Sequence, residues 1–234
     1  MKHQYFGDVN DYRKYGLLRV LAKETGLSLG ICWMLTADDG RRDGKFIEYL
    51  SKPDSWRMLD SNLFDFLAAS VPKGRSLGHV RDSAVLRNAL EHEPELKDSR
   101  VARTEYFADA RKALTGAELV FFDPDNGIEV SSTPLGRKGS CKYLYWEEIE
   151  SAYTAGSSVL VYQHYPRLER RAFARRLAAE MTRRLGVGEI LEFSTAKVAF
   201  ILAPQPYHKA AFEIASRALL RDWGSQFRVH LHTI

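Results

Sequence analysis

The sequence has 234 residues, a formal net charge of +4 and a pI near 9.0. With 45% hydrophobic residues it is long enough to bury one large core, so we expect a single α/β domain over residues 1–234. It has no run of about 18 apolar residues and no apolar segment after its first positive charge, which predicts a cytoplasmic protein without membrane contact. Its two cysteines, Cys32 and Cys141, lack CxxC spacing, which excludes a disulfide framework and a zinc site built on that motif.

The N-terminal part predicts a helix followed by a buried strand. The helix should run from about Tyr12 to Lys23, with an apolar stripe of leucines, a cap at Asp8, Asn10 or Asp11, and an end at Gly26. Residues 29–35 are continuously apolar, which is typical of a parallel strand that is covered on both faces. A polar loop follows at 36–44, and residues 45–95 have mostly helical patterns.

The rest of the chain alternates strand and helix patterns. In order we expect a short strand at 101–104, a helix at 108–114, a central strand at 118–123, a strand at 157–163, an arginine-rich helix at 167–185, two strands at 190–194 and 197–202, a helix at 207–221 and a last strand at 227–232. Only Thr195 and Ala196 separate the two strands after the arginine-rich helix, so these should form an antiparallel hairpin. We therefore expect an α/β fold with a mostly parallel sheet, helices on both faces and a terminal antiparallel hairpin, which resembles the Rossmann-like sheet of class I methyltransferases.

The first candidate site is the turn Asp123-Pro124-Asp125-Asn126-Gly127, directly after the central strand. Ligands of open α/β sheets bind at the carboxyl ends of the strands. Pro124 stops the strand there, so the turn presents the Asp123 carboxylate and backbone carbonyls at that edge. A turn without function is the plain alternative, because each of its residues favours turns.

Two chemistries fit carboxylates at this place. In the first, the Asp123 carboxylate and the Pro124 carbonyl accept hydrogen bonds from an exocyclic amine and direct its lone pair toward a methyl sulfonium. No strong base is then needed, because the amine loses its proton after the methyl has moved. In the second, a metal-dependent nuclease would use Asp123, Asp125 and Glu129 to hold Mg²⁺ or Mn²⁺ and activate water.

Motifs in both halves of the chain resemble those of a known family. The segment from Gly7 to Tyr15 resembles the Gly-Asn-His-Ala-Asp-Val-Leu-Lys-His segment that opens the RlmJ-type methyltransferases, with Gly7, Asp11 and Lys14 identical in register. The turn after Asp123 stands where amine-directed methyltransferases have Asp/Asn-Pro-Pro-Tyr/Phe. The RlmJ-type enzymes modify an adenine of large-subunit ribosomal RNA. The resemblance therefore implies an S-adenosylmethionine-dependent enzyme that methylates an amine of a nucleic-acid base.

The resemblance also implies roles for individual residues. Asp123 and Pro124 would bind the amine, and Lys14 would organise the catalytic site. S-adenosylmethionine would lie beside Asp11, Asp38, Gly40 and Glu105. The substrate would contact Asp125, Asn126, His164 and Tyr165. The family's glycine-rich cofactor loop keeps one glycine here, Gly40, so a non-catalytic nucleic-acid-binding relative is a further alternative.

The helix predicted at 167–185 carries a dense positive charge. It has seven arginines against Glu169 and Glu180, and its apolar residues recur at helical spacing, which indicates a cationic outer face. A solvated face is the plain interpretation. The functional interpretation is a surface that contacts the phosphates of RNA through Arg167, Arg171 and Arg175.

Overall fold

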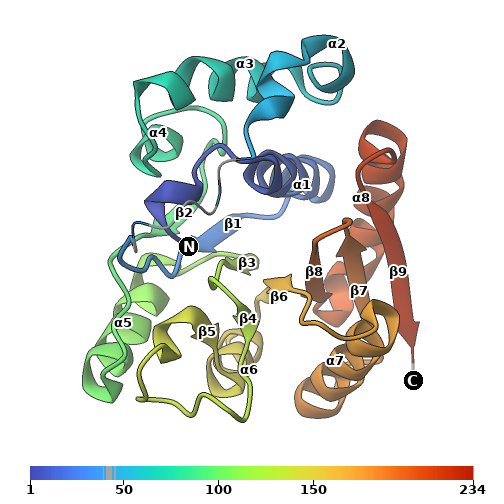
Figure 1. Cartoon of the computed structure of the whole chain (residues 1–234). Coiled ribbons are helices and arrows are strands. Elements are labelled where there is room, and N and C mark those ends of the chain that lie inside the picture. The colour runs from blue at the N-terminus through green and yellow to red at the C-terminus, as the bar shows by residue number, and fades with distance from the viewer. Residues whose placement is uncertain (39, 41–43, 45, 234) are drawn as a thin grey trace.

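The computed structural model describes residues 1–38, 40, 44 and 46–233. The chain forms a mixed α/β fold around a seven-stranded sheet (Figure 1). The strand order is β2-β1-β3-β6-β8-β7-β9. The bounds are β1 Leu29–Cys32, β2 Leu90–His92, β3 Leu119–Phe122, β6 Ser158–His164, β7 Glu189–Ser194, β8 Val198–Ala203 and β9 Arg228–Thr233. A separate short pair is formed by β4 (Gly127–Ile128) and β5 (Tyr143–Leu144).

The large sheet is parallel on one side and antiparallel on the other. Strands β2, β1, β3 and β6 run parallel, whereas β8, β7 and β9 each pair antiparallel with the strand before them in the spatial order. The predicted antiparallel hairpin is confirmed, and its second strand β8 lies between β6 and β7. The carboxyl ends of the four parallel strands therefore share one edge of the sheet, where the candidate turn lies.

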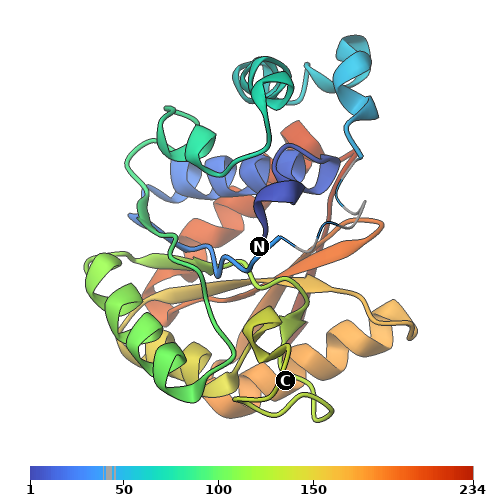
Figure 2. The ribbon, with the colours of Figure 1, turned by 60° about the vertical axis from the view of Figure 1, so that its left-hand side comes forward.

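Helices cover both faces of the sheet. On one face lie α1 (Val9–Thr25) and α8 (Lys209–Trp223), and on the other lie α5 (Arg100–Ala113), α6 (Trp146–Thr154) and α7 (Arg170–Leu185) (Figure 2). Strand side chains alternate between the two layers: Phe121 and Leu160 join the core of the first face, whereas Val120 and Val161 join that of the second. This burial on both faces explains why the central strands are continuously apolar.

Local sequence signals set both ends of α1. The Asp8 carboxylate accepts hydrogen bonds from the backbone N–H groups of Asn10 and Asp11, at 2.7 and 2.9 Å, and so caps the first turn. At the other end, Gly26 adopts a left-handed conformation with φ of 69°. Asp8 as the cap and Gly26 as the end were both among the predicted signals.

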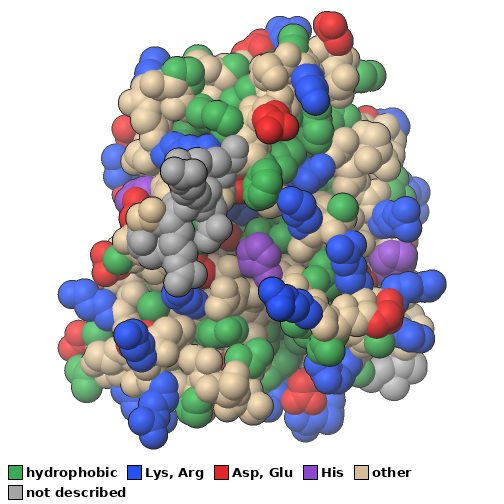
Figure 3. Space-filling model, viewed as in Figure 1, with side chains coloured by type: hydrophobic (Ala, Val, Ile, Leu, Met, Phe, Trp, Pro, Cys, Tyr) green, Lys and Arg blue, Asp and Glu red, His purple; other side chains and the backbone are tan. Residues whose placement is uncertain are grey.

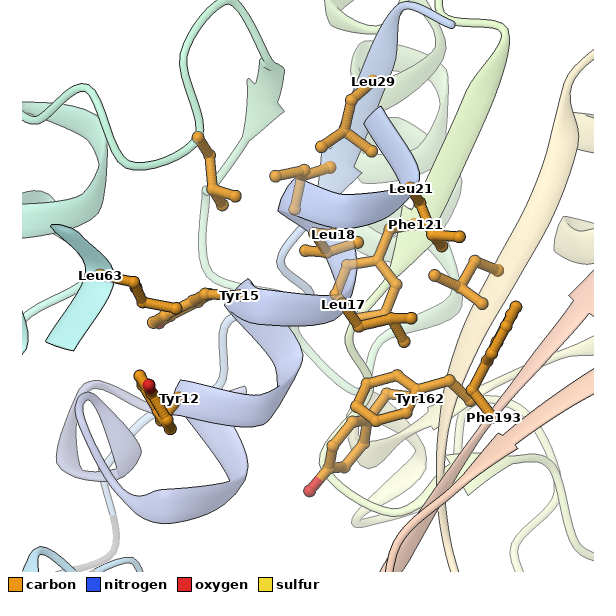
Figure 4. Packing of buried hydrophobic residues seen from close by; sticks show 14 of the residues in the cluster. Tyr12, Tyr15, Leu17, Leu18, Leu21, Leu29, Leu63, Phe121, Tyr162 and Phe193 are labelled. Atoms are coloured by element: carbon orange, nitrogen blue, oxygen red, sulfur yellow. The ribbon is translucent and has the colours of Figure 1, made fainter. Parts of the chain in front are cut away.

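The packing of α1 fixes its position over the sheet. Leu17 and Leu21 point toward Phe121 of β3, and Tyr15 points toward Leu63 of α3 (Ser61–Ser70) (Figure 4). All five side chains are completely buried. Each such burial stabilises the fold by about 1.5–3 kcal/mol, so the first turns of α1 are held firmly beside the carboxyl edge of the sheet.

The segment from 46 to 95 forms a further layer beyond α1. It contains η2 (Glu48–Ser51), α2 (Pro53–Trp56), α3, η3 (Val71–Lys73) and α4 (Gly78–Arg81), and α3 and α4 stack on the side of α1 away from the sheet (Figure 2). Its predicted helical character is correct. The prediction missed β2, because Leu90-Glu91-His92 is too short and too polar to carry a strand pattern.

One predicted strand is wrong. Residues 101–104 lie in the first turns of α5, whose N-cap Ser99 accepts a hydrogen bond from the N–H of Ala102. Val101 is 69% exposed there rather than buried in a sheet. The strand that flanks β1 on this side is β2, and the helix predicted at 108–114 is the second half of α5.

Short 3-10 turns complete the chain: η1 (His3–Tyr5), η4 (Ser140–Lys142) and η5 (Pro206–His208). Cys32 and Cys141 are both free thiols. Within the part of the chain that the structure describes, no helix has the length and apolar character needed to cross a membrane.

Candidate active site

The turn after β3 lies where the sheet changes its direction of winding. From β1 the chain moves first to β2 on one side and then to β3 on the other, so β1 and β3 form a topological switch point. Ligands of open α/β sheets bind at such a point, outside the carboxyl ends of the strands. Asp123 is the first residue after β3, and its N–H donates to the carbonyl of Cys32 at the end of β1 (3.0 Å).

Lys14 and Asp123, which are 109 positions apart in the sequence, form a buried ion pair. Nζ of Lys14 lies 2.6 Å from Oδ2 of Asp123 and 2.8 Å from Oδ1 of Asp11. None of the three side chains is more than 5% exposed. Asp11 and Lys14 lie one turn apart on the same face of α1, which directs both toward the end of β3. The structure thus brings these three predicted site residues together.

The Lys14 ammonium is also surrounded by aromatic rings. The ring centroids of Tyr15, Trp33 and Tyr162 lie 5.3, 5.4 and 5.8 Å from Nζ, within the range of cation–π attraction. Burial alone would lower the pKa of Lys14, but the two carboxylates beside it raise the pKa above its usual value. Lys14 is therefore a fixed cation and hydrogen-bond donor rather than a base.

Asp8 adds a further carboxylate at the same place. Burial raises the pKa of Asp8 to about 7, and the charge of Asp11 adds to the rise. Burial also raises the pKa of Asp11, although that residue accepts hydrogen bonds from Lys14 and from the hydroxyl of Tyr15 (3.1 Å). Asp8, Asp11, Lys14 and Asp123, here named the Lys14 cluster, therefore combine three acidic side chains with one ammonium and bind a proton near neutral pH.

The next carboxylate of the turn is engaged within the protein. Asp125 accepts a hydrogen bond from the hydroxyl of Thr36 (2.7 Å) and pairs with the Met1 ammonium (2.7 Å). Burial alone would raise the pKa of Asp125, but the ammonium and Thr36 hold it below its usual value. The same ammonium donates to the backbone carbonyl of Asp123 (2.9 Å). Asp125 therefore anchors the turn to the N-terminal residues.

Gly127 closes the turn at a place where a side chain does not fit. Its φ is 122°, and a Cβ atom there would lie 2.3 Å from the amide of Gln163 in β6. That amide accepts a hydrogen bond from the N–H of Ile128 (2.9 Å) and donates one to the carbonyl of Asn126 (3.3 Å). The turn is thus tied to the neighbouring strand as well as to its own.

A cavity of about 690 Å³ opens beside the Lys14 cluster. Its lining includes the Lys14 cluster and most of the predicted catalytic and substrate residues, namely Lys14, Asp123, Pro124, Asp125, Asn126, His164, Tyr165 and Arg167. The aromatic side chains of Phe46 and Tyr162 line it as well. Its volume lies within the range of small-molecule sites, and its mixture of rings and carboxylates suits a planar base that carries an amine.

A second hollow of about 780 Å³ adjoins the cavity, because Tyr165 and Arg170 line both. Arg171 and Arg175 line this second hollow, whereas Arg167 precedes α7 and lines the cavity itself. Lysine and arginine side chains gather over the part of the surface formed by α7 and β9 (Figure 3). The predicted arginines thus line two adjoining hollows.

The residues predicted to hold the cofactor do not gather as a group. Asp38 and Gly40 are exposed, and Asp38 accepts a hydrogen bond from the N–H of Gln4 (3.2 Å). Glu105 is exposed on α5, because the segment that precedes it is helix rather than the predicted strand. None of these three is among the described residues that line the cavity. Residues 39 and 41–43 of the predicted loop lie outside the described residues.

The alternative metal ligands have other partners. Glu129 accepts a hydrogen bond from the N–H of Trp146 at the start of α6 (2.9 Å). Asp123 and Asp125 each face an ammonium group, with which a divalent cation would compete. Over residues 1–38, 40, 44 and 46–233, no group of three His, Cys, Asp or Glu side chains is arranged to hold a metal ion.

The cavity suits an amine, whereas most of the residues predicted to bind S-adenosylmethionine lie outside its described lining. The Asp123 carboxylate lines it, as does Asn10, whose Oδ1 is buried without a hydrogen-bond partner among the described residues. Both oxygens can accept hydrogen bonds from an amine. Of the four residues predicted beside S-adenosylmethionine, Asp11 alone belongs to the described lining, so these four do not fit the cofactor as a group.

Several residues around the two hollows were not predicted. Asp8 was predicted as a helix cap only, Tyr162 and Lys197 line the cavity, and Arg13 and Arg228 line the second hollow. Tyr162 could have been found, because alternation along β6 places it on the same face of the sheet as α1. The others are brought together by packing between distant elements, for which the sequence has no local signal.

No protein-family model matches this chain, and no curated protein matches it. Among solved structures it is similar to the crystal structure of protein LPL1258 from Legionella pneumophila str. Philadelphia 1, described under the family model DUF519. The two chains are 13% identical, the match covers 97% of each, and the TM-score is 0.46. The chemistry of the site is therefore the basis for assigning a function.

Proposed function

We propose that this protein is an S-adenosylmethionine-dependent methyltransferase with a class I methyltransferase sheet, and that it acts on an amine of a nucleic-acid base. The observation that carries the proposal is the Lys14–Asp123 pair beside a cavity large enough for a base, at the carboxyl end of β3. The two segments that resemble RlmJ-type enzymes, one in α1 and one after β3, meet at this pair. The β7–β8 hairpin beside four parallel strands supports the same fold.

Asp123 is suited to hold an exocyclic amine. Oδ2 of its carboxylate is engaged by Lys14, which leaves Oδ1 to accept one N–H of the amine, while the Pro124 carbonyl accepts the other. These two bonds direct the nitrogen lone pair away from the turn and toward the electrophile. S-adenosylmethionine would supply the methyl group when bound. An amine can lose its proton to water after methylation, so no side chain would have to act as a strong base.

Lys14 is a positioning residue in this proposal. Its ammonium pairs with the carboxylates of Asp123 and Asp11 and so holds the Asp123 carboxylate in one orientation. Because its pKa is raised, Lys14 holds its own proton throughout and takes none from the substrate. The rings of Tyr162 and Tyr165 would stack on the base, and Asn126 and His164 would contact its edges.

The test is calorimetry with S-adenosylmethionine, followed by mass spectrometry of nucleosides from RNA incubated with protein and cofactor. We expect cofactor binding and a methylated base. Asp123→Asn should bind the cofactor as the native protein does but lose methyl transfer by about 100-fold, the size found when one preorganised polar contact is removed from an active site. Glu129→Gln is the matched control, because it removes a carboxylate that lies outside the cavity lining and should leave turnover unchanged.

Each alternative gives a different result when the calorimetry is repeated with Mg²⁺ and with Mn²⁺. Binding of Mg²⁺ or Mn²⁺ without binding of S-adenosylmethionine would contradict the methyltransferase and support the metal-dependent nuclease. Binding of neither would leave a non-catalytic nucleic-acid-binding protein. Unchanged turnover in Asp123→Asn would show that Asp123 does not bind the amine, although the protein would still be a methyltransferase.

A further inference from the structure

We propose that the second hollow is a groove for the sugar-phosphate backbone of an unpaired nucleic-acid strand whose target base occupies the cavity. This inference rests on the proposed function, since it takes the cavity as the base site. Five arginines line the hollow, and we name it the arginine groove after them: Arg13, Arg170, Arg171, Arg175 and Arg228.

The arginine groove is not simply one face of a helix. Its arginines come from α1, from the first half of α7 and from the start of β9, which are distant in the sequence. The turn between β7 and β8 and the connection from α8 to β9 complete its walls. A concave lining that draws guanidinium groups from three elements matches the shape and charge of a backbone track better than a flat solvated surface does.

The charge in the groove has few internal partners. Within the described part of the chain, the side chains of Arg171, Arg175 and Arg228 form no ion pair. Arg13 donates to the neutral amide of Gln226 at 3.0 and 2.8 Å, which orients the guanidinium without neutralising it. The charges of Arg171 and Arg175 act on the exposed carboxylate of Glu169 and help to lower its pKa, but they form no ion pair with it. Phosphates would therefore meet guanidinium groups that no ion pair among the described residues engages.

The opposite end of α7 shows the contrast. Glu180 accepts hydrogen bonds from both Arg183 and Arg184 at 2.6 Å, and Arg184 also reaches Glu150 (2.9 Å). These arginines are engaged in ion pairs within the protein. Among the described residues, α7 thus has arginines outside ion pairs at the groove and arginines within ion pairs at its other end.

The single carboxylate among the described groove residues does not oppose a phosphate. Glu192 is 5% exposed and accepts hydrogen bonds from the Tyr165 hydroxyl and from Nε2 of His232, both at 2.9 Å. Those bonds fix the Tyr165 ring at the junction of groove and cavity. The guanidinium of Arg170 lies 5.6 Å from the same ring. A strand that leaves the cavity would stack a base on Tyr165, and its phosphates would then contact the arginines.

The depth of the proposed amine acceptor determines the kind of strand. Asp123 is 1% exposed, so a base that pairs in a duplex reaches it only by leaving the stack, which costs stacking and pairing energy. An unpaired strand avoids this cost. The groove should therefore prefer a single strand, RNA or DNA, since both carry the same phosphodiester backbone.

The test compares two double variants of one helix. Arg171→Ala/Arg175→Ala removes two charges from the groove, and Arg183→Ala/Arg184→Ala removes two charges from the compensated end. Binding of a short fluorescein-labelled RNA single strand, the same strand as DNA, and its duplex is measured by anisotropy at several KCl concentrations, without cofactor. We expect the groove variant to bind the single strands about 10-fold more weakly, with a salt slope smaller by about 1.4, the value for two lost phosphate contacts. The control variant should bind as the native protein does.

Equal losses in the two variants, or no loss in the groove variant, would overturn the groove. A duplex that binds as tightly as the single strand and loses as much in the groove variant would overturn the preference for an unpaired strand. The proposed function is judged separately by S-adenosylmethionine binding and methylation. If methylation occurs while the groove variant binds normally, the groove is wrong and the function stands. If the groove variant loses single-strand binding while the native protein neither binds the cofactor nor methylates RNA, the function is wrong and the groove stands as a strand-binding surface.

Discussion

The Lys14 cluster and the far end of α7 both concentrate charge, but under opposite conditions. Every side chain of the Lys14 cluster is at most 6% exposed. At the far end of α7, the side chains of Arg183 and Glu180 are 65% and 33% exposed. Removing one partner of a buried pair leaves an uncompensated charge without water, whereas exposed partners are solvated and contribute little. The comparison teaches that burial, more than the number of charges, decides what each charge does for the protein.

The largest expected effect is on Lys14. Lys14→Met keeps most of the side-chain volume but leaves Asp11 and Asp123 without their shared cation. We expect the free energy of unfolding, measured with urea, to fall by about 3–5 kcal/mol. Lys23→Met is the matched control on the same helix, because the Lys23 side chain is 78% exposed, and it should change stability by less than about 0.5 kcal/mol. Equal effects of the two substitutions would break the contrast between buried and exposed charge.

The parts of the cluster that rest on local pattern could be predicted. Asp11 and Lys14 lie on one face of a helix whose cap and end the sequence signals, and Asp123 follows an apolar strand that Pro124 stops. Their meeting at 2.6–2.8 Å depends on the order of β1 and β3 and on the packing of α1 over them. The resemblance supplied the link between these distant segments, and periodicity alone would not have done so.

The predictions that were wrong or missing concern features that depend on tertiary context. Glu105 was predicted at a strand end because Val101 to Thr104 has strand-like residues, but the cap at Ser99 makes this segment helical and directs Glu105 to solvent. β2 was missed because its partner β1 rather than its own composition makes it a strand. The arginine groove was only half predicted, since Arg13 and Arg228 join it through the three-dimensional arrangement of α1 and β9.

The expected effect of intermediate size is a dependence of stability on pH that comes from the raised pKa of Asp8. This pKa is raised from 3.8 to about 7, so the folded protein holds a proton that the unfolded chain releases. The stability that Asp8 contributes is complete below pH 3.8 and is lost as the pH rises through about 7. Between pH 5 and 8 the free energy of unfolding of the native protein should therefore fall by about 2–3 kcal/mol more than that of Asp8→Asn, which mimics the protonated side chain and retains a cap. Urea unfolding of both proteins across this range checks the prediction, and parallel curves would show that Asp8 titrates normally.

The smallest effect is expected at the compensated end of α7. Arg183→Ala/Arg184→Ala removes both partners of Glu180, yet exposed pairs of this kind contribute little, and salt screens them. The double variant should therefore lose much less unfolding free energy than Lys14→Met does, and the loss should shrink as KCl is raised. Arg171→Ala/Arg175→Ala removes arginines of the same helix that form no ion pair among the described residues, so it should leave stability almost unchanged, although it weakens binding of a single strand. A loss of stability in the groove variant as large as in the other would mean that Arg171 and Arg175 are compensated within the fold, and the contrast between the two halves of α7 would then disappear.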